Sequence, residues 1–355
     1  GHVGWADAAT IIPWTLYMAY GDTDILRRQY SSMKRWVDCI ISQVGDDYLW
    51  NTGWHYGDWL FYSENNDCAG NSAVTYTPLC QQCHFANSAD IVARTATVLG
   101  YSDDAAKYNN VAAKAREAFA KAYMTPSGML VSHTQTAYTL ALVYNMVPAE
   151  CRPLLAANLD AAVKRYGHIT TGFLGTSHIS TVLTQNGDNN TAYDLLWRQQ
   201  YPGWLYPVTM GATTIWERWN SMMPDHTIPD NGMNSFNHYS YGSIGDWLYR
   251  EAAGLKESMP GYKTIEIRPH PGYGFSWMEA RQITPYGEAL SRWSIGESGE
   301  LTLEVEIPFN TSAMVYVPVT RGAEVRIDGM PAEYEIEDGY AGFGVGSGHY
   351  VFNVR

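Results

Sequence analysis

Glu217 has the surroundings that most suggest chemistry. In the stretch GATTIWERWNSM it lies between Trp216 and Trp219, with Arg218 beside it. An apolar setting disfavours the charged form of a carboxyl group, so this placement is costly unless the group is used. The ordinary explanation is a helix surface on which Glu217 pairs with an arginine. The stretch alone leaves both explanations open.

Other acidic residues also stand beside tryptophan. Asp58 occurs in YGDWL and Asp7 in GWADAA, and Asp246 repeats the pattern as GDWL. Asp246 lies near the expected domain boundary, where core packing explains it as well. His238 occurs in SFNHYSYGS, at the expected start of a helix and 21 residues after Glu217. Caps of helices or turns remain open for Asp58 and Asp7, and a backbone-bonded histidine remains open for His238.

Carboxylates, aromatic rings and a histidine are together what glycoside hydrolysis needs. One acid protonates the leaving oxygen, one base activates water, and rings hold the sugar. The chain has 26 Tyr, 13 Trp and 9 Phe, which make up 14% of its 355 residues. Aromatic rings stack on flat ligand faces as well as on one another. Most of them must pack in the core, but their excess favours a carbohydrate ligand.

Charge and hydropathy argue against two other classes of partner. The formal net charge of −13 is opposite to the basic footprint of a nucleic-acid-binding protein. No apolar run approaches the roughly 20 residues that span a bilayer. We therefore expect a soluble protein with neither a nucleic-acid nor a membrane partner.

The cysteines do not suggest a disulfide framework, because the set is odd in number and sparse. Cys80 and Cys83 form a C-x-x-C followed by a histidine, letters that also fit a haem attachment or half of a zinc site. No second ligand pair follows at a matching spacing, and the segment continues as an amphipathic helix. We expect buried helix cysteines, no metal and no cofactor. The full set is Cys39, Cys68, Cys80, Cys83 and Cys151.

Residues 5 to about 253 show the apolar spacing of successive helices. Many candidates begin at Asp, Ser or Thr and end at Gly, as capping chemistry requires. We expect about ten, paired by short turns such as 20–24 and 99–104, which suggests a toroid or solenoid of hairpins. No fixed-period repeat is visible. The candidates include DILRRQYSSMKRWVDCIISQV, AAKYNNVAAKAREAFAKAY, AECRPLLAANLDAAVKRYG, ATTIWERWN and YSYGSIGDWLYREAAG.

Two long insertions, 51–80 and 222–238, are rich in aromatic and polar residues. Long loops on a helical scaffold commonly carry binding and catalysis. The alternative is a poorly ordered surface segment, which is usually poor in aromatic residues. Trp54, Tyr56 and Trp59 therefore favour a functional loop at 51–80.

After residue 256 the pattern changes to short segments of alternating apolar and polar residues. Seven or eight strands in the last part of the chain fit an antiparallel sandwich. We expect a helical domain over 1–255 and a β-sandwich over 256–355. The strand candidates are TIEIRPHPG, WMEARQITPYG, ALSRWSIGES, LTLEVEIPF, SAMVYVPV, AEVRIDG and HYVFNVR.

An ordered set of motifs resembles the bacterial α-L-rhamnosidases of glycoside hydrolase family 78. The resemblance covers nearly the whole chain, and its motif set is specific. In the helical part it rests on HVGWADAATIIPWTLYMAYGDTDILRRQYSSMKRWVDCI, GWHYGDWL, TTGFLGTSH, GATTIWERWNSM and SFNHYSYGSIGDWLY. KTIEIRPHPG and ITPYGEALSRWSI are similar to the terminal β-sandwich of that family.

The resemblance implies a fold and a set of roles. It implies a mainly α chain with an (α/α)6 barrel and a β-sandwich, an inverting mechanism and no catalytic metal. By the resemblance, Glu217 is the general base that activates water, and His238 contacts the bound rhamnose. Trp5 and Trp59 match aromatic positions of the sugar site, although barrel packing is an alternative for both. Asp58 and Asp7 are weaker assignments to the substrate-binding set listed here: His238, Trp5, Trp59, Asp58 and Asp7.

One family motif has no counterpart. The general acid of the family is a Glu in a D-C-P-Q-R-x-E-R-x-G-W-type motif, and this sequence has none. We therefore expect a barrel without its first helices, whose missing N-terminal domains are possible partners. The implied substrate is a rhamnose-bearing glycoside or polysaccharide. A non-catalytic sugar-binding fragment and another (α/α)6 glycosidase or lyase remain open, and the sequence does not indicate a cellular location.

Overall fold

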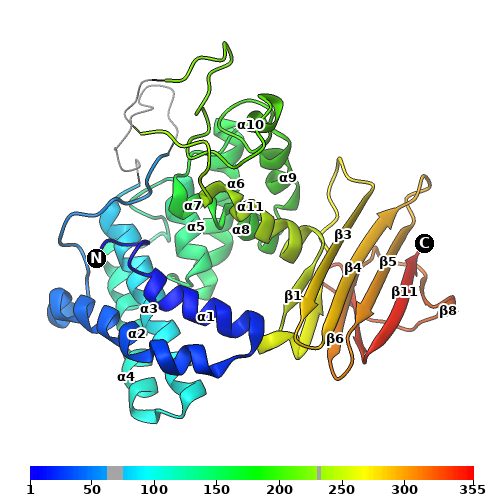
Figure 1. Ribbon diagram of the computed structural model, residues 1–355, viewed down its shortest axis with the longest axis horizontal. Coiled ribbons are helices and arrows are strands. Elements are labelled where there is room, and N and C mark those ends of the chain that lie inside the picture. The colour runs from blue at the N-terminus through cyan, green and yellow to red at the C-terminus, as the bar shows by residue number, and fades with distance from the viewer. Residues whose placement is uncertain (62–74, 230–232) are drawn as a thin grey trace. The chain divides into compact units, whose positions relative to one another are not determined.

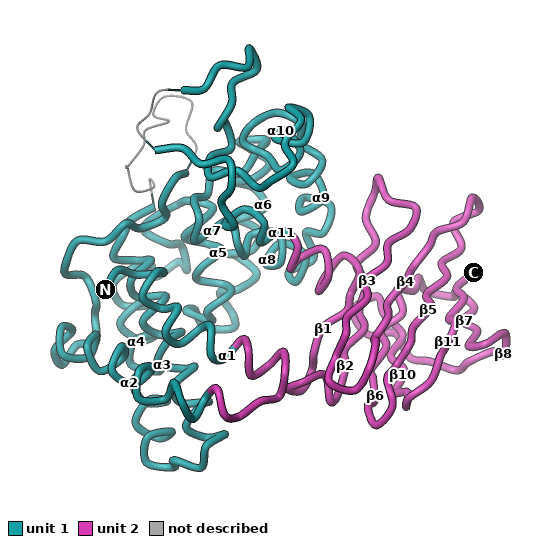
Figure 2. Tube along the Cα trace, viewed as in Figure 1, with its two compact units in different colours: residues 1–14, 26–244 teal, residues 15–25, 245–355 magenta. Residues whose placement is uncertain are grey.

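The computed structural model describes residues 1–61, 75–229 and 233–355 (Figure 1). They form two compact units, residues 1–14 with 26–244 and residues 15–25 with 245–355 (Figure 2). The domain limits 1–255 and 256–355 stay a prediction, because the second compact unit contains residues 15–25 as well as the strands. Cys68 and the middle of the loop expected at 51–80 lie outside the described residues. No helix within the described ranges combines the length and apolar character needed to cross a membrane.

The first unit is built of helical hairpins whose helices are adjacent in sequence. α3 packs against α4, α5 against α6, and α8 against α9. Gly100 ends α3 at a φ of 80°, and its N–H donates to the Thr97 carbonyl, a conformation that suits glycine. The helices are α1 (Ala8–Tyr20), α2 (Thr23–Val44), α3 (Thr77–Leu99), α4 (Ser102–Tyr123), α5 (Gln135–Val143), α6 (Arg152–Tyr166), α7 (Phe173–Thr176), α8 (Ile179–Gln185), α9 (Asn189–Trp197) and α10 (Leu205–Thr209). Short 3-10 turns occur at Gly45–Asp47, Ala149–Cys151 and Ser240–Ser243.

α3 is buried on nearly all sides and forms the centre of this unit. Cys80 and Cys83 are free thiols with no solvent exposure, which confirms the prediction of buried helix cysteines. Gln82 is equally buried, and its amide donates to the carbonyls of Tyr48 and Ala115. Such bonds remove the penalty of burying a polar side chain.

Two predicted helices differ in the structure. The segment ATTIWERWN, expected to be helical, contains only turns, bends and residues without regular structure. Its β-branched start at Thr213 and Thr214 disfavours a helix, and the Glu217 N–H and the Ile215 carbonyl bond to Ser235 and His238 rather than within a helix. The segment expected as one helix at 239–254 is a 3-10 turn, then α11 (Ile244–Trp247), then a π-helical turn, η4 (Leu248–Ala252).

The second unit is a sandwich of two sheets. One has the order β1-β2-β6-β10-β9 and the other the order β3-β4-β5-β11-β7-β8. All pairs are antiparallel except β2 with β6, among the described strands. The strands are β1 (Leu255–Glu257), β2 (Thr264–Ile267), β3 (Trp277–Thr284), β4 (Gly287–Ile295), β5 (Leu301–Ile307), β6 (Ser312–Pro318), β7 (Val325–Ile327), β8 (Met330–Pro331), β9 (Ile336–Glu337), β10 (Tyr340–Val345) and β11 (Gly348–Val354). All seven strand candidates are present, and the sandwich is confirmed.

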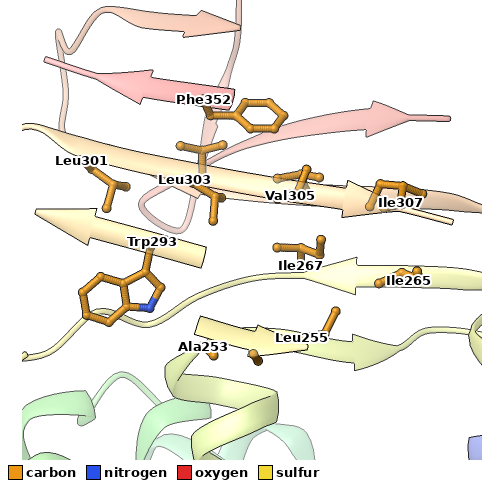
Figure 3. Close-up of a cluster of buried hydrophobic side chains, with 14 of the residues drawn as sticks. Ala253, Leu255, Ile265, Ile267, Trp293, Leu301, Leu303, Val305, Ile307 and Phe352 are labelled. Atoms are coloured by element: carbon orange, nitrogen blue, oxygen red, sulfur yellow. The ribbon is translucent and has the colours of Figure 1, made fainter. Parts of the chain in front are cut away.

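The core of the sandwich follows from strict alternation along the strands. In β5 the residues at alternate positions, Leu301, Leu303, Val305 and Ile307, are all buried. They meet Ile265 and Ile267 of the other sheet in one cluster (Figure 3). A period of two places every second side chain on the same face of a strand, so the residues between them face outward.

Candidate active site

The Glu217 segment is held by pairing with the chain around His238. The Glu217 N–H donates to the Ser235 carbonyl at 2.8 Å, and the His238 N–H donates to the Ile215 carbonyl at 2.8 Å. Two residues 21 positions apart are therefore held on adjacent segments of irregular backbone. These two backbone bonds hold the segments of Glu217 and His238 side by side.

Glu217 is nearly buried, and its carboxylate has no partner among the described residues. The residue is 9% exposed, and its carboxylate accepts no hydrogen bond and forms no ion pair with any described residue. Arg218 is turned elsewhere, since its Nε donates to the Met233 carbonyl at 2.8 Å. The explanation of Glu217 as half of a helix-surface ion pair is therefore wrong. The Glu217 oxygens are not among the fully buried polar atoms that lack a partner, so they keep accessible surface and have lone pairs for a water or ligand.

An apolar cavity of about 290 Å³ lies at the same turn. Trp216, Arg218 and Trp219 contribute to its wall, and Glu217 does not. Trp219 stacks on Tyr241 with ring centroids 3.8 Å apart. The residues flanking Glu217 thus pack as a rigid aromatic support, while the carboxylate lies outside the cavity that they line.

His238 has a fixed ring and a defined tautomer. The Ser240 N–H donates to Nδ1 at 3.3 Å, so Nδ1 is the acceptor and the proton of the neutral ring lies on Nε2. The ring stacks on Phe173, with centroids 5.1 Å apart and planes 20° apart. The sequence left open that His238 is only bonded to the backbone. That bond is present, and it leaves the Nε2–H available as a donor.

Asp58 is fully buried and accepts four hydrogen bonds. The N–H of Gly172 and the Thr136 hydroxyl donate to Oδ2, and the N–H groups of Leu174 and Gly175 donate to Oδ1. Burial raises the pKa of its carboxyl, and the four donors act against that rise. Asp58 therefore caps the first turn of α7 and ties the 58–59 turn to it.

Asp7 has the same kind of environment at the start of α1. It is fully buried, and its carboxylate accepts bonds from the Gly4 N–H at 2.8 Å, the Trp36 indole at 2.8 Å and the Ser88 hydroxyl at 2.6 Å. The bond to Gly4 closes the turn that presents Trp5. The structure thus supports the cap interpretation for Asp7 as it does for Asp58.

Trp5 and Trp59 belong to one aromatic cluster. Tyr56 lies between them, with ring centroids 4.8 Å from Trp5 and 5.2 Å from Trp59. Trp5 is 41% exposed and Trp59 is half-buried, so both retain ring surface for a ligand. His55 joins their turns, because its Nδ1 accepts from the Val3 N–H at 3.1 Å and its Nε2 contacts the Thr52 carbonyl.

Contacts connect all six predicted site residues. The Phe173 N–H donates to the Trp59 carbonyl at 2.9 Å, and the Phe173 ring stacks on His238. The aromatic cluster, the Asp58 cap and the Glu217 segment are therefore continuous. Sequence reasoning did not single out Phe173; the motif TTGFLGTSH contains it, but no local signal marks its ring as the support of His238.

No cluster of metal-binding side chains occurs in the described ranges. The thiols of Cys80 and Cys83 are held in α3, and burial raises the pKa of each well above its usual value. His84, the last residue of the C-x-x-C-H motif, bonds through Nδ1 to the Cys80 carbonyl. The motif is used here for packing within a helix.

Comparisons with known families agree with this arrangement. Residues 1–252 match the model of the bacterial α-L-rhamnosidase six-hairpin glycosidase domain, and residues 254–330 match that of the bacterial α-L-rhamnosidase C-terminal domain. The first match names the class: helical hairpins that carry a carboxylate and stacked rings, followed by a sandwich, are those of a six-hairpin glycosidase.

Named relatives and solved structures extend the match. An α-L-rhamnosidase of Streptomyces avermitilis is 38% identical over 100% of this chain and 33% of its own length, and one of Formosa agariphila is 37% identical over 92% and 35%. A crystal structure of the Streptomyces avermitilis α-L-rhamnosidase complexed with L-rhamnose superimposes with a TM-score of 0.88 at 37% identity, covering 98% of this chain and 33% of that one. That of the native Aspergillus terreus enzyme gives 0.89 at 33% identity, covering 99% and 39%.

The chain belongs to the bacterial α-L-rhamnosidase family. The family resemblance, the helical class and the terminal β-sandwich expected from the sequence are confirmed by these matches. The chain spans about a third of the length of the relatives it matches.

Proposed function

We propose that the protein containing this chain releases terminal α-L-rhamnose from glycosides or polysaccharide by inverting hydrolysis. The observation that carries the proposal is Glu217, a nearly buried residue whose carboxylate has no partner among the described residues and whose backbone is fixed beside the His238 segment. A solved relative of the same fold is described as complexed with L-rhamnose, which supports the choice of sugar.

In the proposed mechanism Glu217 is the general base. Its free lone pairs accept a proton from water, which attacks the anomeric carbon from the face opposite the leaving oxygen. A second carboxyl group about 6.5–9.5 Å away protonates that oxygen in inverting enzymes. Asp7 and Asp58 do not fit this role, because their buried oxygens are occupied by donors. We place the proton donor outside the six residues of this site.

The remaining residues bind or position the substrate. His238 donates from Nε2 to a sugar hydroxyl, with Phe173 holding its ring. Trp5 and Trp59 offer ring surface to the apolar face of the sugar. Asp7 and Asp58 act through the turns that carry Trp5 and Trp59 and are positioning residues.

The occupied oxygens of Asp7 and Asp58 also favour a second candidate, a barrel that binds rhamnose without cleaving it. Hydrolysis of an aryl α-L-rhamnoside by this chain and by Glu217→Gln separates the two. Under the catalytic proposal the substitution lowers turnover by about 10²–10⁴-fold, and the first product has the β configuration by proton NMR.

L-rhamnose protection against thermal unfolding supplies the control. Protection in both proteins, with turnover in neither, would support the binding-only candidate for this chain. Turnover that survives in Glu217→Gln would exclude Glu217 as the base. Loss of protection in Glu217→Gln with a lowered melting temperature would instead show that the substitution damages the fold.

A further inference from the structure

One row of side chains crosses the outer face of the six-stranded sheet. Trp277 of β3 pairs with Ser294 of β4, Ser294 with Thr302 of β5, and Thr302 with Asn353 of β11. Asn353 in turn pairs with Arg326 of β7. Directly paired residues project from the same face of a sheet, and strands lie about 4.8 Å apart, so the row extends over about 19 Å.

The row faces away from the sandwich core. The next residues along the same strands, Met278, Trp293, Leu303, Phe352 and Ile327, are also paired in a row, and they belong to or pack on the buried cluster. Successive side chains alternate between faces, so the row of Trp277 lies on the opposite side. Its exposure agrees: Trp277 is 62% exposed and Ser294 is exposed.

The row begins with the Trp277 ring, which no described ring covers, and its polar side chains can accept or donate further hydrogen bonds. The Trp277 ring makes no ring-stacking or cation–π contact with any described residue. The Asn353 amide donates to the Thr302 hydroxyl at 3.1 Å, which leaves the Asn353 carbonyl as an acceptor and the Thr302 O–H as a donor. Ser294 has no side-chain hydrogen bond within the described ranges. An indole beside hydroxyl and amide groups offers both kinds of contact that a pyranose ring takes.

Charge on this face selects a neutral ligand. The neighbouring row is made of ion pairs, since Arg292 bonds to Glu279 and Glu304, and Glu304 also bonds to His349. At the end of the Trp277 row, Arg326 is paired with Glu324. Most opposite charges near the row are thus paired, and Glu306, further along β5, is the exposed exception among the described residues. The apolar centre of a protein–protein interface does not suit this surface either, because Trp277 is the one large apolar side chain of the row.

We propose that this row is a binding surface for a neutral polysaccharide chain, separate from the Glu217 site. Trp277 stacks on one sugar ring, and Ser294, Thr302 and Asn353 bond to hydroxyl groups of the rings that follow along the row. The surface would hold the protein on its polymeric substrate or on a polymer that accompanies it.

Affinity gel electrophoresis tests the proposal with the full chain carrying Glu217→Gln, so that no polymer is cleaved. The gels contain a rhamnan, a galactan, a xylan or a dextran. At least one of these polysaccharides should retard the protein. Trp277→Ala should raise the apparent Kd about tenfold, because one stacking contact is lost. Added salt should leave the retardation unchanged, because the ligand is neutral.

Ile283→Ala is the matched control. Ile283 lies on the same strand and face and is 71% exposed, but it is outside the row. Unchanged retardation in Ile283→Ala and unchanged L-rhamnose protection in Trp277→Ala would support a second, independent site. The proposal is overturned if no polymer retards the protein, or if Trp277→Ala and Ile283→Ala behave alike.

Discussion

At the scale of single residues, Asp58 and Asp246 show how far identical letters can differ in physical role. Both occur in Gly-Asp-Trp-Leu. Asp58 is fully buried and accepts four hydrogen bonds, whereas the Asp246 side chain is 65% exposed and lies 3.9 Å from Arg250. The letters cannot distinguish them, because the donors to Asp58 come from residues more than 70 positions away.

Asp58→Asn should therefore destabilise the chain far more than Asp246→Asn. An amide accepts on one oxygen only, and its NH2 would face N–H donors. We expect the free energy of unfolding to fall by about 3 kcal/mol for Asp58→Asn and to stay within about 0.5 kcal/mol for Asp246→Asn. Urea unfolding followed by circular dichroism measures both. Equal small effects would contradict the capping role.

His238 makes a second prediction at this scale. Its Nε2–H is a single donor, so His238→Ala should weaken L-rhamnose binding by about three- to tenfold, measured by calorimetry. His226→Asn is a suitable control, because His226 is an exposed histidine of the same loop whose φ of 63° asparagine tolerates. If His238→Ala and the unaltered chain bind L-rhamnose with equal affinity, His238 does not contact the sugar.

At the scale of elements, the structure places the 172–175 turn directly against the 58–59 turn. A Cβ added to Gly172 would lie 2.3 Å from the carbonyl oxygens of Asp58 and Trp59. Gly172→Ala should therefore lower the free energy of unfolding by about 3 kcal/mol and weaken rhamnose protection, because it moves Phe173 from under His238.

Gly245→Ala provides the contrast in a thermal unfolding experiment. Gly245 lies in α11, and an added Cβ would meet nothing within 4 Å. Alanine is the better helix former, so this variant should be stabilised by about 0.5–1 kcal/mol. A Gly172→Ala protein as stable as Gly245→Ala would mean that the two turns can separate at little cost.

Elements were predictable from sequence where their pattern is local. The buried face of α2, with Leu26, Tyr30, Met33 and Val37, has the helical spacing, and β5 has strict alternation. The Glu217 segment was misread because Ser235 and His238 satisfy its backbone, and no local period reports such distant bonds. β10 (Tyr340–Val345) was missed because its glycines hide the alternation.

The candidate site was predictable to a similar extent. The family motifs supplied Glu217, His238, Trp5 and Trp59, and the structure connects them through Tyr56 and Phe173. The roles of Asp7 and Asp58 were left open at the sequence level, because a carboxylate beside tryptophan can cap a turn or bind a sugar. Only the donors around each oxygen decide between those functions.

At the scale of the whole molecule, acid should destabilise both compact units. Burial lowers the pKa of His178 in the first unit to about 4, with a contribution from His84, and lowers that of His270 in the second to about 4. These values lie below the unfolded value of about 6.5. The unfolded chain therefore binds protons first as the pH falls, and stability is lost from about pH 6.5 down to about pH 4.

The free energy of unfolding should fall by about 2 kcal/mol for each of these histidines when the pH is lowered from 7 to 5. Calorimetric melting temperatures at the two pH values measure the sum. His178→Gln and His270→Gln should each flatten the pH dependence, whereas an exposed-site change such as His226→Asn should not. A pH dependence unchanged in both glutamine variants would assign the acid sensitivity to other groups.

The packing of α3 also allows local unfolding around this helix to be measured by cysteine labelling. Cys39 is exposed, whereas Cys80 and Cys83 are buried and their thiols are poor nucleophiles. A thiol reagent should modify Cys39 at once and reach Cys80 and Cys83 only when α3 loosens from its neighbours. Mass spectrometry of pulse-labelled protein would then follow α3 alone. Sugar binding at the candidate site, whose Asp58 lies close enough to Cys80 to raise the pKa of its thiol, would register as slower labelling of two thiols outside the six site residues.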